Sequence, residues 1–117
     1  MQLVGKRDAS LMREVAASAD ATAKEQRRVA SLVRRIADQR EREIPWSSII
    51  EKGTLTSSVE LLGRGAHRLR TGASKMRRLA ARGLLNEGLT TRQVGRRFGV
   101  SHQRISALLS SNPGDDR

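Results

Sequence analysis

Residues 89–109 restrict the fold of this chain more than any other stretch, because they carry signals that start and stop two short helices. Thr90 and Gln93 have the three-residue spacing of a capping box, in which each side chain satisfies a backbone N–H of the other. Gly99 stands where a left-handed backbone would end the first helix. Ser101 is suited to cap a second helix. The stretch therefore predicts two short helices joined by a tight turn.

The apolar residues of the same stretch support this interpretation. Their spacing fits two helices packed against each other better than one long helix. Gly95 is small enough for the second helix to cross closely over the first. These apolar and small residues occupy the structural positions of a helix-turn-helix, with Gly99 as its hinge. The apolar positions are Val94, Phe98, Val100, Ile105 and Leu108.

The positive charge is concentrated in the same part of the chain. Residues 1–63 hold 11 Lys and Arg against 9 Asp and Glu, a net charge of +2. Residues 64–110 hold 11 Lys and Arg against Glu87 alone, a net charge of +10, and residues 111–117 carry −1 of the total of +11. A field of this size around the two short helices suits a polyanionic partner. Arg outnumbers Lys there, which favours bidentate contacts with phosphate and guanine.

Composition argues against several other classes of protein. The chain has no Cys, so neither a disulfide nor a thiolate metal site is expected. Its only histidines, His67 and His102, lie on segments with no acidic partner except Glu87, and no phosphate-binding glycine loop is present. We therefore expect no enzyme activity, no metal and no cofactor. No apolar run approaches the length of a membrane span and no secretory signal opens the chain, which predicts a cytoplasmic protein, on the nucleoid if the source is bacterial.

Residues 1–43 are predicted to form two N-terminal helices, at about 8–20 and 23–42. The stretch from Thr22 to Glu25 has capping-box spacing, which favours a helix start there over one uninterrupted helix. These helices are interpreted as an arm that forms a homodimer or docks another protein. Alternatively they cover the core of the same subunit, where they would pack on Trp46 and Ile50. The predicted association surface consists of Val29, Leu32, Val33 and Ile36.

Residues 44–72 are predicted to contain short helices and a basic linker. Pro45 suits the first turn of a helix that directs Trp46, Ile49 and Ile50 inward, and another short helix would end near Gly63. Residues 44–62 also resemble residues 89–107 at an offset of 45, through either a decayed second helix-turn-helix or chance. Residues 63–72 are interpreted as a flexible arm for the DNA minor groove or as a short helix, 65–71. The arm residues are Arg64, Arg68 and Arg70.

Residues 73–110 are predicted to be the helix-turn-helix domain, which begins with a helix over 73–86 capped by Thr71 or Ser74. The tail, 111–117, is expected to be frayed. The predicted fold class is therefore all-α, with an N-terminal helical arm or hairpin and a tri-helical domain. The residues of helix 73–86 expected to face inward are Met76, Leu79, Ala80, Leu84 and Leu85. Those expected to face outward are Lys75, Arg77, Arg78 and Arg82.

Residues 85–90, LNEGLT, followed by residues 94–101, VGRRFGVS, resemble the C-terminal DNA-binding domains of bacterial resolvases and invertases and region 4 of sigma factors. The resemblance implies that the second helix enters the major groove of duplex DNA. It does not extend before Arg64, so recombinase and sigma-factor activities are not implied. The implied base contacts are Ser101, His102, Gln103, Ser106 and Ala107, with Arg104 beside them. The implied phosphate contacts are Thr91, Arg92 and Arg96, with Arg97 beside them.

Several functions are compatible with these features. The first is a sequence-specific regulator of transcription that binds double-stranded DNA as a homodimer. The second is a DNA-binding adaptor, such as an antitoxin or phage regulator, whose N-terminal helices bind another protein. The third is a nucleoid or partition protein with little sequence preference. An RNA-binding module is disfavoured because the chain lacks an aromatic stacking surface.

Overall fold

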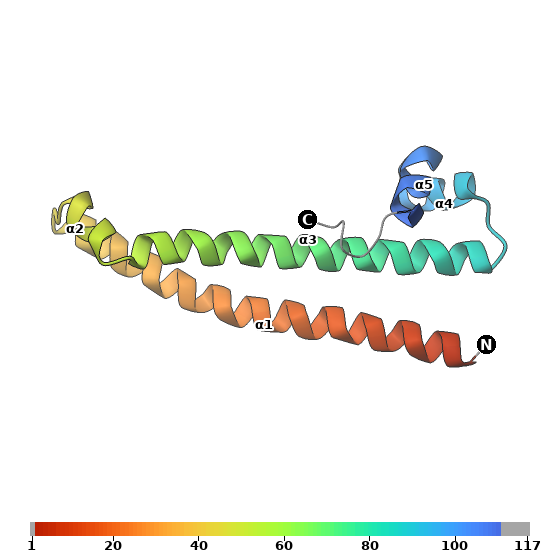
Figure 1. The fold of residues 1–117 in the computed structure, drawn as a ribbon, viewed down its shortest axis with the longest axis horizontal. Helices are drawn as coiled ribbons and strands as arrows, with labels where there is room; N and C mark the ends of the chain where they lie inside the picture. The colour runs from red at the N-terminus through yellow and green to blue at the C-terminus, as the bar shows by residue number, and fades with distance from the viewer. Residues whose placement is uncertain (1, 111–117) are drawn as a thin grey trace. The chain divides into compact units, whose positions relative to one another are not determined.

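The computed structural model describes residues 2–110, with side chains from residue 5 onward, and all regular structure in this range is helical. The predicted all-α class is thereby confirmed, whereas the tail predicted to be frayed, 111–117, lies outside the described residues. No helix in this range is long and apolar enough to cross a membrane. The helices are α1 (Gln2–Glu41), α2 (Trp46–Glu51), α3 (Thr54–Asn86), α4 (Thr91–Phe98) and α5 (His102–Ser110) (Figure 1).

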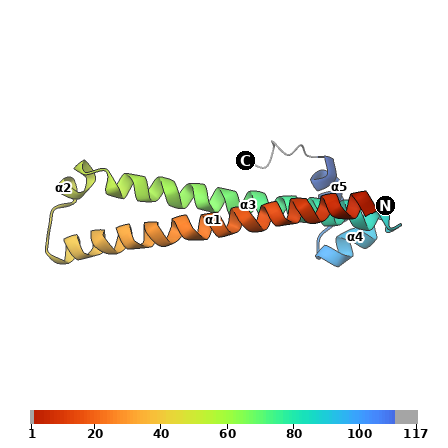
Figure 2. The same cartoon turned by 90° about the horizontal axis from the view of Figure 1, so that it is seen from below.

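The chain divides into two compact units that we describe separately. The hairpin unit comprises residues 16–69, and the terminal unit comprises residues 1–15 together with residues 70–117. Within the hairpin unit, α1 and α3 run side by side in opposite directions and are joined through α2 (Figure 2). Within the terminal unit, α4 and α5 lie beside the end of α3 (Figure 1).

The predicted division of the N-terminal region into helices 8–20 and 23–42 is wrong, because α1 continues without interruption. Thr22 does not cap a helix; its side chain is buried at 1% exposure within α1. Glu25 forms an ion pair with Arg68 of α3 instead of closing a capping box. A capping signal takes effect only where backbone N–H groups are free, and the packing of α1 along α3 keeps the helix continuous.

The predicted linker is also wrong, because residues 63–72 lie inside the 33-residue helix α3. Gly65 is buried where α1 passes closely: a Cβ at this position would overlap the Gln26 amide and lie 3.4 Å from Thr22 Cγ2. The glycine therefore allows a close helix crossing and does not interrupt the helix. Residues 44–62 do not form a second helix-turn-helix like that predicted for residues 89–107. Their second helix is not a short helix but the beginning of the 33-residue helix α3.

Trp46 and Ile50 were predicted to face inward, but they are 50% and 52% exposed. Ile49, between them, is buried as predicted at 2% exposure. The Trp46 ring instead packs beneath the Arg40 guanidinium, 4.9 Å from ring centroid to Cζ, and the same guanidinium donates a hydrogen bond to Ile44 O at 2.7 Å. A cation over an indole ring stabilises both groups without burying them.

The core of the terminal unit brings the last turns of α3 against α4 and α5. Ala81 of α3, Val94 of α4 and Ile105 of α5 are each at most 1% exposed. The predicted apolar residues of α4 and α5 contribute to it, as do Leu84 and Leu85 of α3. The buried Ala81 was not among the residues of α3 predicted to face inward, and Met76, which was, is 46% exposed. The half-buried residues around this core are Leu84, Leu85, Leu89, Phe98, Val100, Leu108 and Leu109.

Candidate nucleic-acid interface

The two short helices begin at the predicted caps. Thr90 Oγ1 accepts a hydrogen bond from Gln93 N at 3.2 Å, and Gln93 Oε1 accepts one from Thr90 N at 2.8 Å, so the predicted capping box is confirmed. Ser101 Oγ accepts a hydrogen bond from Arg104 N at 3.2 Å at the start of α5. Each cap satisfies backbone N–H groups that have no partner within the helix.

The turn between α4 and α5 is built on two glycines, as predicted. Gly99 adopts φ 69° and ψ 29°, and the N–H groups of Gly99 and Val100 bond to Arg96 O and Gly95 O, at 3.3 and 2.9 Å. This is the Schellman arrangement, in which a left-handed residue lets the chain reverse while the last carbonyls stay bonded. A Cβ on Gly95 would lie 2.6 Å from Val100 O, so the first helix and the turn touch through backbone atoms.

Helix α5 buries one side and presents the other to solvent. Ile105 is 1% exposed, and Leu108 and Leu109 also pack on the core. Gln103 and Ala107 are four residues apart and share the opposite face with Ser106. Most of the predicted base-contacting residues are therefore accessible. The exposed ones are Ser101, Gln103, Arg104, Ser106 and Ala107, whereas His102 is half-buried.

Helix α4 supplies the exposed positive charge beside α5. The guanidinium-bearing residues Arg92, Arg96 and Arg97 are exposed, and Thr91 is half-buried. Arg96 and Arg97 also line a surface hollow with Glu87 and Gln93. The two guanidinium groups could hold a phosphate group by charge-assisted hydrogen bonds, against which the Glu87 carboxylate in the same lining would act.

Arg78 was predicted to face solvent but is 4% exposed. Its Nε donates a hydrogen bond to Leu108 O at 3.4 Å, which joins α3 to the last turn of α5. The charge also lies near the carboxyl end of α5, where a helix dipole favours a cation. Arg78 therefore supports the position of α5 from behind. No local pattern distinguishes it from its exposed neighbour Arg77, so sequence analysis missed this role.

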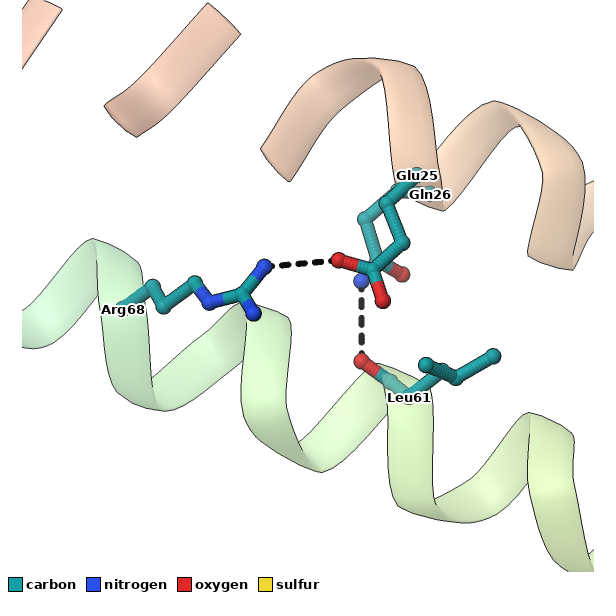
Figure 3. A network of polar contacts seen from close by, with 4 residues as sticks. All are labelled: Glu25, Gln26, Leu61 and Arg68. Atoms are coloured by element: carbon teal, nitrogen blue, oxygen red, sulfur yellow. Dashed lines mark hydrogen bonds and ion pairs between the residues drawn. The ribbon is translucent and has the colours of Figure 1, made fainter. Parts of the chain in front are cut away.

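The predicted minor-groove arm is wrong, because Arg64, Arg68 and Arg70 are part of helix α3. Arg68 Nη1 donates to Glu25 Oε2 at 2.6 Å, which joins α3 to α1 (Figure 3). Beside this pair, Gln26 Nε2 donates to Leu61 O at 2.9 Å. These residues hold the hairpin unit together and are not on a flexible segment.

The predicted association surface is wrong for half of its residues. Val29 is 1% and Ile36 is 6% exposed, so both are already buried within one chain. Leu32 is half-buried and only Val33, at 43%, is largely accessible. The face of α1 that carries this stripe also carries Gln26, which bonds to α3. The intramolecular alternative therefore describes this stripe better, although its partner is not the exposed pair Trp46 and Ile50.

Comparison of the chain with protein-family models, with curated proteins and with solved structures finds no significant match.

Proposed function

We propose that this protein is a sequence-specific regulator that binds double-stranded DNA, with α5 in the major groove and α4 on the phosphate backbone. In this proposal the end of α3, α4 and α5 act as a tri-helical helix-turn-helix domain. Gln103, Ser106 and Ala107 read base edges, while Arg92 and Arg96 contact phosphates on either side. This activity implies a cytoplasmic protein that works on the nucleoid.

The observation that carries this proposal is the division of α5 into two faces. Ile105 anchors the helix in the core at 1% exposure, while the opposite face carries small and amide side chains and no acidic residue. Gln can bond to adenine through two atoms, and Ala can contact the thymine methyl group. The exposed arginines belong to α4, which packs on α5 through the shared core, and phosphate contacts from such a helix fix the register of its neighbour in the groove.

The proposal is tested by selecting binding sites from random duplex DNA with the full chain. A defined consensus is expected. Gln103→Ala should then lose discrimination at one base pair by about 1–3 kcal/mol, with the rest of the consensus unchanged. Arg92→Ala and Arg96→Ala should weaken binding to all sequences alike. Arg27→Ala, which removes an exposed arginine from the hairpin unit, serves as the control and should bind as the unaltered chain does.

The outcomes separate the alternatives. An unchanged consensus for Gln103→Ala would contradict the assignment of the reading face. Tight binding without a consensus would favour the nucleoid or partition protein, because phosphate contacts alone carry no sequence information. Absence of binding to any duplex would overturn the proposal.

A further inference from the structure

Helix α3 carries a second apolar stripe, which lies beside the side that faces α1. Ser58 and Gly65, seven residues apart, are buried toward α1. The stripe follows the same seven-residue step from Val59 to Ala66 and from Leu62 to Leu69. Val59, Leu62 and Leu69 are 62%, 49% and 52% exposed, so large apolar side chains are open to solvent along this helix.

Helix α1 carries a matching stripe of small residues. Its buried positions, Thr22, Val29 and Ile36, also follow a seven-residue step. Beside them an alanine recurs at the same step four times, at residues 16, 23, 30 and 37, and Ala19 and Val33 complete the stripe. Gln26 is the polar side chain on this path, and its amide is already bonded to Leu61 O. The residues of this second stripe, which are the four alanines with Ala19 and Val33, are all exposed except Ala30, which is half-buried.

The two stripes lie on the same side of the hairpin unit. The buried residues of the two helices form the seam between them. In an antiparallel pair, a residue four positions after a seam residue lies on the same side of the pair whichever of the two helices it belongs to. Val33 follows Val29 by four, as Leu62 follows Ser58. Together the stripes form one surface, which we call the outer apolar face. It consists of Ala16, Ala19, Ala23, Ala30, Val33 and Ala37 of α1 and Val59, Leu62, Ala66 and Leu69 of α3.

The size of the outer apolar face can be compared with that of a stable interface. Residues 16–37 of α1 span roughly 33 Å, residues 59–69 of α3 span roughly 16 Å, and each helix is about 10 Å wide. The flat face is thus roughly 500 Å² before surface relief is counted, which is a large part of the ~800 Å² that each partner buries in a specific complex. Of the charged residues in this stretch of α1, three border the alanine row, because each follows one of its alanines by four residues: Asp20, Arg27 and Arg34. The others lie off the face: Lys24, Glu25, Arg28 and Arg35.

The side chains on the face also complement one another in size. The α3 stripe supplies Val and Leu side chains that project, while the α1 stripe is a row of alanines that leaves room. A two-fold axis parallel to the helices would place α3 of each copy on the alanines of the other, so both stripes would be satisfied at once. The hairpin unit also has a thin core, in which Val29, Ile36 and Ile49 are the buried apolar residues, and it gains most from such burial.

We propose that the outer apolar face binds the same face of a second copy of this chain, forming a four-helix bundle. The side chains of Val59, Leu62 and Leu69 pack on the alanine row of the partner's α1. Knobs at seven-residue spacing against small residues give the close helix packing of such bundles. This surface differs from the stripe of Val29 and Ile36, whose side chains are already buried within one chain. The proposal goes beyond the proposed DNA binding and does not depend on it.

Sedimentation equilibrium of the full chain without DNA tests the proposal. The unaltered chain should sediment with twice the mass of one chain at micromolar concentration. Leu62→Glu with Leu69→Glu should raise the dissociation constant by about 100-fold or more, because each glutamate would be buried unpaired in the dimer. The matched control, Ser57→Glu with His67→Glu, adds the same charges at exposed positions of α3 off the face and should remain dimeric. A monomeric unaltered chain, or a dimer that survives the Leu62 and Leu69 changes, would overturn the proposal.

A second measurement does not require the charged variant to fold. The chain has no Cys, so single cysteines can be introduced without side reactions. A mixture of Ala30→Cys chains and Val59→Cys chains should form an interchain disulfide on mild oxidation, because α3 of one copy lies on α1 of the other. A mixture of Ala30→Cys and Ser57→Cys chains is the control and should link much more slowly. Equal linking in the two mixtures would contradict the proposed packing.

Discussion

Thr22 shows how a single polar atom can weaken a helix seam. Its hydroxyl is buried in the hairpin unit and has no hydrogen-bond partner among the described residues. We expect Thr22→Val to raise the free energy of unfolding by about 1 kcal/mol, because valine keeps the shape and removes an unsatisfied group. Ser58→Ala is the control: Ser58 Oγ is equally buried but donates to Thr54 O at 2.8 Å, so its loss should destabilise the chain. Chemical denaturation measures both, and a lower stability for Thr22→Val would contradict the expectation.

Gly95 is the residue on which the geometry of the α4–α5 turn depends most. We expect Gly95→Ala to lower the free energy of unfolding by about 1–3 kcal/mol, since the new methyl group would press on the backbone carbonyl of Val100. Gly83→Ala in α3 is the matched control, because a Cβ at Gly83 meets no atom within 4 Å and alanine favours the helix. Thermal unfolding followed by circular dichroism compares them. Equal melting temperatures for the two variants would show that the close approach at Gly95 is not required.

At the scale of helices and turns, the end of α1 carries strain that the other turns avoid. Glu43 has φ 64°, and the N–H groups of Glu43 and Ile44 bond to Arg40 O and Gln39 O, at 2.8 and 3.0 Å. The same bond pattern ends α3 at Gly88 and α4 at Gly99, where glycine adopts the positive φ readily. Within residues 2–110, the end of α1 is therefore the one helix end of this kind at which the residue with positive φ is not a glycine.

We expect Glu43→Gly to stabilise the chain by up to about 1 kcal/mol, because the left-handed conformation costs a non-glycine residue about 1–2 kcal/mol and glycine loses part of that gain through backbone entropy. Glu41→Gly removes the same charge inside the last turn of α1 and should destabilise it by about 0.5–1 kcal/mol. Urea denaturation of both variants provides the measurement. Destabilisation by Glu43→Gly as large as that by Glu41→Gly would refute the assignment of strain.

At the scale of the whole molecule, charge separation along the chain should govern the proposed DNA binding. The segment 64–110 carries +10, whereas residues 1–63 are nearly balanced. We assume that Arg92, Arg96 and Arg97 of each copy neutralise three phosphates. A plot of the logarithm of the binding constant against the logarithm of the salt concentration should then have a slope near −3 per copy, because each phosphate contact contributes about −0.9. Titrations of labelled duplex at several salt concentrations measure the slope. Arg96→Ala should make it shallower by about one contact per copy, and a slope near zero would contradict an electrostatic interface.

Local sequence signals by themselves determined α4, the turn and α5. Capping by Thr90 and Ser101 and the reversal at Gly99 involve hydrogen bonds between residues three to five positions apart, so the chain encodes them without knowledge of the rest of the fold. The apolar spacing of Val94 and Ile105 likewise predicted the core they share. The exposed heptad stripes of α1 and α3 were also present in the sequence, but periodicity cannot show which of two apolar stripes on one helix faces the neighbouring helix.

Only the tertiary structure decided the lengths of α1 and α3 and the burial of their side chains. The capping pattern at Thr22 and the glycines of residues 63–72 predict breaks when each segment is considered alone. Packing of the two helices at Gly65 outweighs those weak preferences, since the free energy of a buried helix seam exceeds that of one cap or one glycine. The same long-range contacts bury Arg78 behind α5, while Trp46 stays half exposed beneath the Arg40 guanidinium. Which arginine supports the helix and which one meets solvent depends on residues distant in sequence, and that information exists only once the chain has folded.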